Sequence, residues 1–284
     1  MNSSIQLLLR DDSAALQTAL QLDFSSARIE VQCLLQAVLQ VNRAYLFTHP
    51  ERILSDAESS RYHALFARRL QGEPVAYLLG EREFFGLNFK VTPATLIPRP
   101  DTELLVELAL AKIPQQGVYR VLDMGTGSGA IALSIAYARP NAQVWAVDFS
   151  EAALQIAQEN QRALQLKNVT LLQSDWFAAL AQQRFDMIVS NPPYIEFDDV
   201  HLSQGDVRFE PLTALASGAD GLDDIRRIAS QALQHLNPQG WLMFEHGYDQ
   251  AAAVREILQQ AGLKNIFSAQ DLAGIERVTG GCAR

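Results

Sequence analysis

A glycine-rich loop between two apolar segments limits the fold of this chain more than any other feature. Residues 120–124 read Arg-Val-Leu-Asp-Met, the loop reads Gly125-Thr126-Gly127-Ser128-Gly129, and residues 131–138 are largely apolar. Glycines at such a junction let a ligand approach the backbone closely, because they carry no Cβ atom. The sequence therefore predicts a strand, a ligand-binding turn and a helix, a pattern that also fits a dinucleotide fingerprint.

Short apolar segments alternate with helical segments after this loop. The expected strands cover residues 120–124, 143–148, 169–172, 185–190, 240–245 and 263–267. Strands that alternate with helices build a mostly parallel sheet with helices on both faces. We expect an α/β, Rossmann-like domain over residues 101–284 that begins with a helix from about Asp101 to Ile113.

The first 72 residues follow a different pattern. They are rich in Leu, Ala and Gln, and apolar residues such as Ile29 and Cys33 recur at helical spacing. Residues 73–100 contain more Gly, Pro and aromatic residues, and the alternation from Leu87 to Val91 is typical of a β-hairpin. We expect a small helical bundle over residues 1–72, joined by a hairpin and linker over residues 73–100 to the α/β domain.

Composition and charge exclude several classes of protein. With 48% hydrophobic residues the chain can bury a core, and no apolar run approaches the roughly 20 residues that span a bilayer. The N-terminus lacks a secretory pattern, so we expect a cytoplasmic protein. The net charge of −9 argues against a protein that binds mainly phosphates. Cys33 and Cys282 are isolated from each other and from the histidines, so we expect no metal site.

Acidic residues lie at the ends of three expected strands. Asp123 lies beside the glycine loop, Asp148 ends the second strand, and Asp175 and Trp176 follow the third. A carboxylate beside the loop repels a pyrophosphate but suits a cation. S-adenosylmethionine carries a sulfonium and an ammonium, offers a ribose to Asp148 and has no phosphate. We therefore expect S-adenosylmethionine rather than NAD as the cofactor.

The pair Asp175-Trp176 has two interpretations. As part of a cofactor site, Asp175 accepts a hydrogen bond from the adenine amino group while Trp176 packs on the ring. As ordinary structure, Asp175 caps a helix and Trp176 belongs to the core. Their place at the end of the third strand favours the first interpretation.

The tetrapeptide Asn191-Pro192-Pro193-Tyr194 ends the fourth expected strand. Prolines have no N–H donor and hold the residue before them extended, so the Asn191 side-chain oxygen and the Pro192 carbonyl form a corner rich in acceptors. Such a corner suits a planar –NH2 group, whose lone pair it orients toward a methyl group while Tyr194 stacks on the plane. A rigid Pro-Pro turn explains the tetrapeptide alone equally well, but its order after the glycine loop and Asp148 favours methyl transfer.

Together these motifs resemble those of the HemK/PrmC family of release factor glutamine methyltransferases. The matching stretches are residues 72–78, 83–86, 96–103, the glycine loop, 191–194, 208–211, 216–222 and 271–274. The resemblance covers the chain from about residue 72 to its end. Phe85 stands where family members often have Trp.

The resemblance implies a class I S-adenosylmethionine-dependent methyltransferase that methylates N5 of the glutamine in the Gly-Gly-Gln motif of bacterial class-I peptide release factors 1 and 2. S-adenosylhomocysteine would be the product. By position, Gly125 to Gly129 line the cofactor, Asp148 binds the ribose, Trp176 flanks the adenine, and Asn191 to Tyr194 hold the substrate amide. The helical domain and the hairpin would bind the release factor. The resemblance further implies a monomer that contacts neither membrane nor nucleic acid directly.

Other functions remain open on the sequence. A sister family methylates a glutamine of ribosomal protein L3 with the same tetrapeptide, and amino-methylating nucleic-acid enzymes use similar corners. The segments around Arg99 and Arg208 favour the release factor family. Neither residues 1–90 nor the rest of the chain has an excess of basic residues, which disfavours DNA as the substrate. A nicotinamide-dependent oxidoreductase has no use for Asn191 to Tyr194. A cofactor-binding module without catalysis is the non-enzyme alternative.

Overall fold

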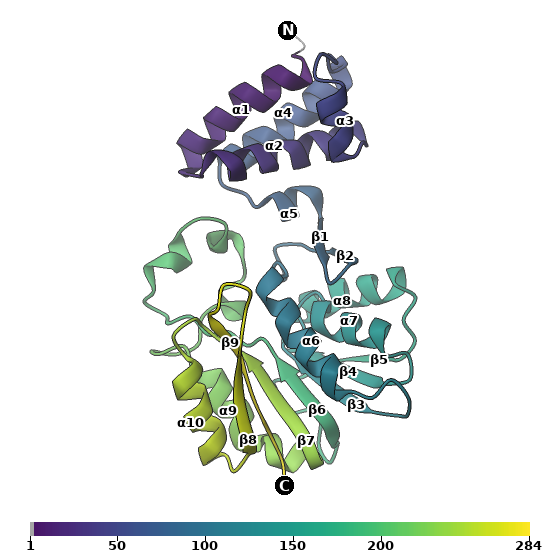
Figure 1. Ribbon diagram of the computed structural model, residues 1–284, viewed down its shortest axis with the longest axis vertical. Coiled ribbons are helices and arrows are strands. Elements are labelled where there is room, and N and C mark those ends of the chain that lie inside the picture. The colour runs from purple at the N-terminus through teal and green to yellow at the C-terminus, as the bar shows by residue number, and fades with distance from the viewer. Residues whose placement is uncertain (1–2) are drawn as a thin grey trace. The chain divides into compact units, whose positions relative to one another are not determined.

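The computed structural model describes residues 3–284, which form two compact units (Figure 1). The helical unit comprises the residues up to Gly80 together with Ser203–Phe209, and the sheet unit comprises Glu81–Leu202 and Glu210–Arg284. The chain therefore leaves the sheet unit at residue 203 and returns to it at residue 210. No helix among residues 3–284 is long and apolar enough to cross a membrane.

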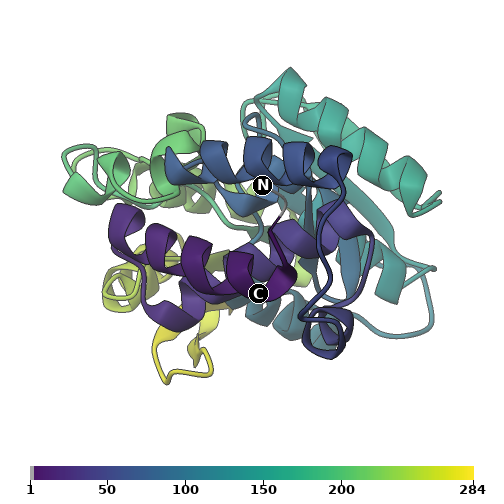
Figure 2. The same cartoon turned by 90° about the horizontal axis from the view of Figure 1, so that it is seen from above.

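The helical unit is a bundle, as expected. Its helices are α1 (Ile5–Leu20), α2 (Phe24–Leu39), α3 (Arg43–Thr48), α4 (Asp56–Leu70) and α5 (Val75–Leu79). Helices α1 and α2 run side by side (Figures 1 and 2). The first four helices begin at a polar residue whose side chain accepts a backbone N–H bond, which stabilises the helix start. Leu78 packs in the same core as Leu34 and Tyr62, so the unit extends past Gly72, where we expected its end.

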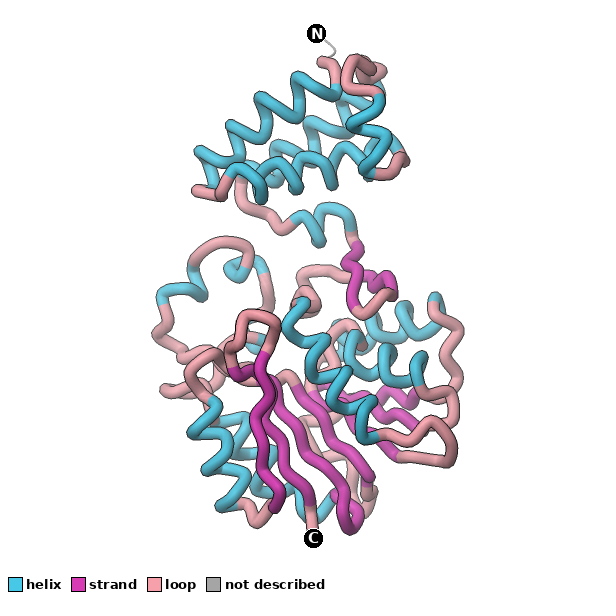
Figure 3. Tube along the Cα trace, in the orientation of Figure 1, coloured by secondary structure: helices cyan, strands magenta, loops and turns pink. Residues whose placement is uncertain are grey.

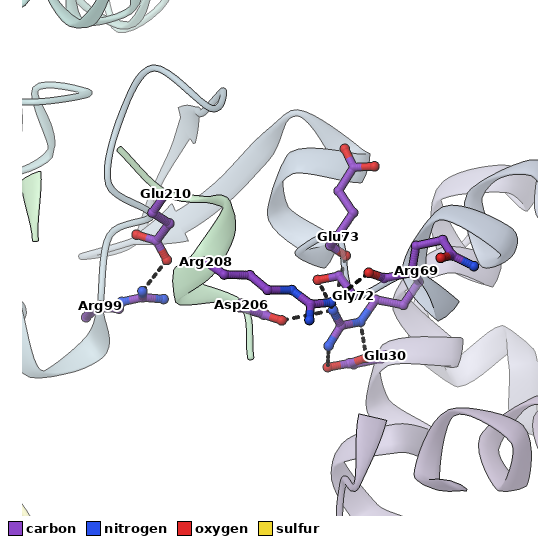
Figure 4. Close-up of polar contacts among 9 residues, drawn as sticks. Glu30, Arg69, Gly72, Glu73, Arg99, Asp206, Arg208 and Glu210 are labelled. Atoms are coloured by element: carbon purple, nitrogen blue, oxygen red, sulfur yellow. Dashed lines mark hydrogen bonds and ion pairs between the residues drawn. The ribbon is translucent and has the colours of Figure 1, made fainter. Parts of the chain in front are cut away.

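Charged residues fix the returning segment, Ser203–Phe209, in the helical unit (Figure 4). The Arg69 side chain is only 2% exposed and pairs with Glu30 at 2.6 Å and with Asp206 at 2.9 Å. Arg208, in the 3₁₀ turn η3 (Val207–Phe209), donates to the Gln71 carbonyl at 2.7 Å. Buried guanidinium groups need such partners, because an unpaired buried charge is strongly destabilising.

The sheet unit begins with the expected hairpin, formed by β1 (Glu81–Phe84) and β2 (Leu87–Lys90). Its two-residue turn places Phe85 at φ +52° and Gly86 at φ +73°. Positive φ at both turn positions is typical of the turns that connect hairpin strands. Phe84 and Phe89 are buried in the core of the sheet unit, so the hairpin is part of this unit.

A seven-stranded sheet forms the centre of this unit, in the order β5-β4-β3-β6-β7-β9-β8 (Figure 3). The strands are β3 (Arg120–Met124), β4 (Gln143–Asp148), β5 (Val169–Gln173), β6 (Phe185–Ser190), β7 (Leu236–Glu245), β8 (Lys264–Gln270) and β9 (Glu276–Cys282). Strands β3 to β7 pair in parallel, and β9 runs antiparallel to both of its neighbours. The expected mostly parallel sheet is confirmed.

The strand β9 escaped the sequence analysis. Gly280 and Gly281 remove the apolar alternation that reveals a strand. The packing explains these glycines, because a Cβ at Gly280 would lie 2.9 Å from the side chains of Met243 and Phe267. Because Met243 of β7 and Phe267 of β8 are the residues paired with Gly280, their side chains fill the space that a side chain of β9 would occupy.

Helices cover both faces of the sheet (Figure 1). One face carries α6 (Glu103–Lys112), α7 (Ala130–Ala138) and α8 (Glu151–Ala163), and the other carries α9 (Asp223–His235) and α10 (Ala251–Gln260). Neighbouring strand residues alternate between the two cores: Val121 belongs to the first and Leu122 to the second. The 3₁₀ turn η1 (Pro100–Thr102) directly precedes α6, and η2 (Val200–Ser203) and η4 (Leu212–Ala214) lie between β6 and α9.

Candidate active site

A cleft of about 540 Å³ opens at the carboxyl ends of the parallel strands. The chain adds β4 and β5 on one side of β3 and then crosses to β6 on the other, and ligands of open α/β sheets bind at such a crossing. The lining includes Leu96, Gly125, Gly127, Asp148, Phe149, Asp175, Trp176, Asn191, Pro193, Asp224 and Arg227. The volume is typical of a site for a small organic ligand.

The glycine loop borders this cleft with backbone rather than side chains. Gly125, Gly127 and Gly129 have φ of +73°, +56° and +85°, a region that other residues rarely adopt. Gly125 and Gly127 line the cleft, whereas Thr126 and Ser128 are buried. Gly129 begins α7, and a Cβ there would lie 2.9 Å from Leu133.

Asp123 lies beneath the loop rather than in the wall of the cleft. It is fully buried, and its Oδ2 accepts from the Thr126 hydroxyl at 2.6 Å and from the Ala132 amide at 3.2 Å. Its Oδ1 has no hydrogen-bond partner within residues 3–284. Burial raises the pKa of Asp123 to about 7. The carboxyl therefore fastens the loop to the first turn of α7, whereas the sequence led us to expect contact with the ligand.

Asp148 ends β4 and does face the cleft. Its two oxygens accept backbone N–H bonds, Oδ2 from Gly127 and Oδ1 from Ser150, both at 2.8 Å. Burial raises the pKa of Asp148. A carboxylate has about four lone-pair positions, so these two bonds orient the group and leave acceptors for ligand hydroxyls.

Trp176 and Asp175 both line the cleft, but each has a protein partner. The Trp176 ring lies 3.6 Å from where a Cβ of Gly125 would be, and its Nε1 donates to Asp224 at 3.1 Å. Asp175 forms an ion pair with Arg227 at 2.7 Å. The sequence analysis missed Asp224 and Arg227, because α9 lies far along the chain and no motif links it to β5.

Asn191 and Pro193 also line the cleft. The Asn191 side-chain nitrogen donates to the Thr102 hydroxyl at 3.3 Å, which leaves its Oδ1 for another donor. The preceding Ser190 donates to the Met124 carbonyl at 2.7 Å and so ties the end of β6 to the end of β3. The structure thus brings the glycine loop together with Asn191 and Pro193 of the tetrapeptide at one cleft.

Hydrogen bonds fix both the backbone and the side chain of Tyr194. Its backbone nitrogen donates to the Leu215 carbonyl at 3.1 Å, and its carbonyl accepts from Gln250 at 2.9 Å. A Cβ at Gly221 would lie 2.1 Å from the same carbonyl, so only glycine fits there. The Tyr194 hydroxyl donates to Glu245 at 3.4 Å, and burial raises its pKa. Pro192 is buried, and neither it nor Tyr194 is among the residues that line the cleft.

His246 makes structural contacts. Its Nε2 lies 2.8 Å from the Thr279 hydroxyl and its Nδ1 lies 2.9 Å from the Gly247 carbonyl, and the side chain is buried. Burial lowers its pKa. Within the part of the chain that the structure describes, no three His, Cys, Asp or Glu residues are grouped as metal ligands.

Comparison with known proteins covers both units. The profile of a family described as "Methyltransferase domain" matches residues 116–274, and that of "PrmC N-terminal domain" matches residues 8–80. The release factor glutamine methyltransferases of Xylella fastidiosa and Pseudomonas aeruginosa are both 52% identical to this chain. These alignments cover 89% and 90% of this chain, and 92% and 93% of the relatives.

Among solved structures, a methyltransferase from Pyrococcus furiosus matches with a TM-score of 0.53 and 20% identity. The match covers 76% of this chain and 95% of that one. At this identity the likeness concerns the fold alone, and it agrees with the mostly parallel sheet described above.

Proposed function

The chain belongs to the release factor glutamine methyltransferase family, and we propose that it transfers a methyl group from S-adenosylmethionine to N5 of the glutamine in the Gly-Gly-Gln motif of peptide release factors 1 and 2. The observation that carries this proposal is the acceptor corner at Asn191, which faces the same cleft as the glycine loop and Asp148. The relatives, about half identical over most of their length, do not favour the ribosomal protein L3 alternative.

The cleft fits the expected cofactor. Backbone of Gly125 and Gly127 forms one wall, the Asp148 carboxylate retains acceptors for a ribose, and Trp176 offers an aromatic face. Among the described residues that line it, the one basic residue, Arg227, is paired with Asp175, so this lining offers no free cation to a pyrophosphate. When bound, S-adenosylmethionine supplies an electrophilic methyl carbon attached to a sulfonium.

The chain's own residues prepare the substrate nitrogen. An amide nitrogen is a weak nucleophile because its lone pair is delocalised into the carbonyl. Asn191 Oδ1, in the lining of the cleft, accepts one N–H bond, and we propose that the carbonyl of the adjacent, buried Pro192 accepts the other, so that the lone pair points toward the methyl carbon. In the transfer, the N–C bond would form as the C–S bond breaks, S-adenosylhomocysteine would leave, and the positively charged nitrogen beside these acceptors would lose one proton to water.

The helical unit and the β1–β2 hairpin are proposed to hold the release factor. Neither the helical unit nor the hairpin contributes a residue to the lining of the cleft. The match of residues 8–80 to a domain specific to this family supports a function for the helical unit other than catalysis. We further propose that the enzyme is cytoplasmic, since its substrates act on cytoplasmic ribosomes, and that it is a monomer.

A substrate variant tests this function. The purified chain is mixed with labelled S-adenosylmethionine and either a wild-type release factor or one with the Gly-Gly-Gln glutamine replaced by alanine. We expect one methyl group per wild-type release factor and none on the alanine form. Equal labelling of both would contradict the proposed acceptor residue.

A further inference from the structure

A buried carboxylate lies behind the acceptor corner. Glu245 ends β7 and is 1% exposed. Its Oε1 accepts the Tyr194 hydroxyl at 3.4 Å, and its Oε2 has no hydrogen-bond partner anywhere in residues 3–284. A buried charged group without full pairing is costly to the fold, and groups of this kind are concentrated at functional sites.

A second contact leads from this carboxylate to Asn191. Thr102 is buried, and its hydroxyl lies close enough to Glu245 to lower the pKa of that carboxyl. The same hydroxyl accepts from the Asn191 side-chain nitrogen at 3.3 Å. Although Thr102 stands at the start of α6, its side chain does not cap that helix. The hydroxyl is therefore available to connect the two groups.

The direction of these hydrogen bonds depends on the charge of Glu245. An ionised carboxylate only accepts, so it attracts the single hydroxyl hydrogen of the nearby Thr102. The Thr102 oxygen then accepts from Asn191, which places the amide nitrogen of Asn191 toward Thr102 and its Oδ1 away from Thr102. A donor at position 245 would allow the opposite direction, with the Asn191 oxygen turned inward.

We propose that Glu245 is a positioning residue, which acts through Thr102 to aim Asn191 Oδ1 at the substrate amide and through the Tyr194 hydroxyl to fix the rest of the corner. This inference rests on the proposed function, because it concerns the same acceptor corner. Glu245 itself touches neither substrate nor cofactor. Its effect is on the orientation of the groups that do.

Charged neighbours set the pH range in which this arrangement holds. Burial raises the pKa of Glu245 to about 7, and the Asp101 carboxylate contributes to the rise. The Thr102 hydroxyl and the Arg277 guanidinium act in the opposite direction and lower this pKa. Arg277 is shared with Asp101 at 3.7 Å and Asp271 at 3.1 Å. As the pH falls through about 7, Glu245 gains a proton, becomes a donor and no longer fixes the direction of the bonds.

The test compares Glu245→Gln with wild type, using S-adenosylmethionine and a release factor. Gln keeps the shape and brings a donor, so kcat should fall at least about tenfold, while KM for S-adenosylmethionine stays within about twofold. Wild-type kcat should decline below about pH 7, and the variant should lack this decline. Glu256→Gln, on the exposed side of α10, is the matched control and should behave as wild type.

Variants at Thr102 keep the test decisive even if Glu245→Gln is unstable. Thr102→Val removes the connecting hydroxyl and should lower kcat by a similar factor, whereas Thr102→Ser retains it and should recover most of the activity. Wild-type kcat and an unchanged pH profile in Glu245→Gln, or full activity in Thr102→Val, would overturn the inference. Failure of the wild-type chain to methylate any release factor would instead overturn the proposed function.

Discussion

The two walls of the cleft are built in different ways. On the cofactor side, Gly125, Gly127 and Asp148 come from two consecutive strand–helix units, and Asp148 accepts from the Gly127 amide. On the acceptor side, Asn191 to Tyr194 are held by Thr102, Gly221 and Glu245, which are remote from them in the chain. The first wall is stabilised by local backbone geometry, the second by contacts between distant elements.

This difference in construction predicts that the first wall determines how tightly the cofactor binds, and that the second determines how the substrate amide is oriented. A backbone wall tolerates many side-chain changes, provided that the glycines remain. The acceptor corner depends on the position of single oxygen atoms, and a displacement of about 1 Å can lower a rate about a hundredfold. We therefore expect changes on the cofactor side to appear as altered affinity, and changes on the acceptor side to appear as altered kcat.

The largest effect is expected for Asn191→Ala. The change removes one of two amide acceptors in the transition state, so kcat should fall by about a hundredfold or more. Calorimetry should show S-adenosylhomocysteine binding within about twofold of wild type. Asn265→Ala, at a side chain that contacts only Cys282 among the hydrogen bonds described, serves as the control. If Asn191→Ala also weakened S-adenosylhomocysteine binding about a hundredfold, the two walls would not have these separate functions.

Asp148→Ala should show the opposite pattern. Loss of a charged acceptor for ribose hydroxyls costs about 1.5–3 kcal/mol, which weakens binding about tenfold to a hundredfold. The dissociation constant of S-adenosylhomocysteine measures this effect, and kcat at saturating cofactor should change far less. An unchanged dissociation constant would refute the assignment of Asp148 to the cofactor.

Gly221→Ala tests the support of the corner from a distant element. Its Cβ would lie 2.1 Å from the Tyr194 carbonyl, so the backbone after Pro193 must shift and kcat should fall about tenfold. Gly274→Ala is a matched control, because Gly274 also has positive φ, at +80°, but a Cβ there meets nothing within 4 Å. Equal activity of the two variants would show that the corner does not depend on this contact.

The smallest effect on activity is expected for Asp123→Asn, which should change stability instead. Burial raises the pKa of Asp123 from 3.8 in the unfolded chain to about 7, so the native state binds more protons between these values. The free energy of unfolding therefore falls as pH rises from about 4 to about 7. Urea titrations across this range should show a smaller fall for the variant. An identical pH dependence would mean that Asp123 is ionised throughout.

Sequence reasoning predicted best what is local. The glycine loop and the tetrapeptide each follow a strand directly and Asp148 is the last residue of one, so their common edge follows from the parallel sheet. It did not separate Asp123 from Asp148, because both end strands and only packing places the first beneath the loop.

Non-local contacts were beyond prediction. Nothing in the sequence links Arg227 with Asp175, or Glu245 with Thr102 and Tyr194, since these partners meet only through the strand order. The same holds for Ser203–Phe209, which joins the helical unit although it follows the tetrapeptide in the chain. Such contacts carry no periodicity or motif that a single sequence reveals.

The most direct test of the central claim is methyl transfer from labelled S-adenosylmethionine to a purified release factor, ribosomal protein L3 and duplex DNA in parallel, followed by peptide mass spectrometry. We predict one methyl group, on the glutamine of the Gly-Gly-Gln motif, and no label on the other two. Label on L3 or DNA in place of the release factor would contradict the assigned substrate, and no label on any of them would contradict the activity itself.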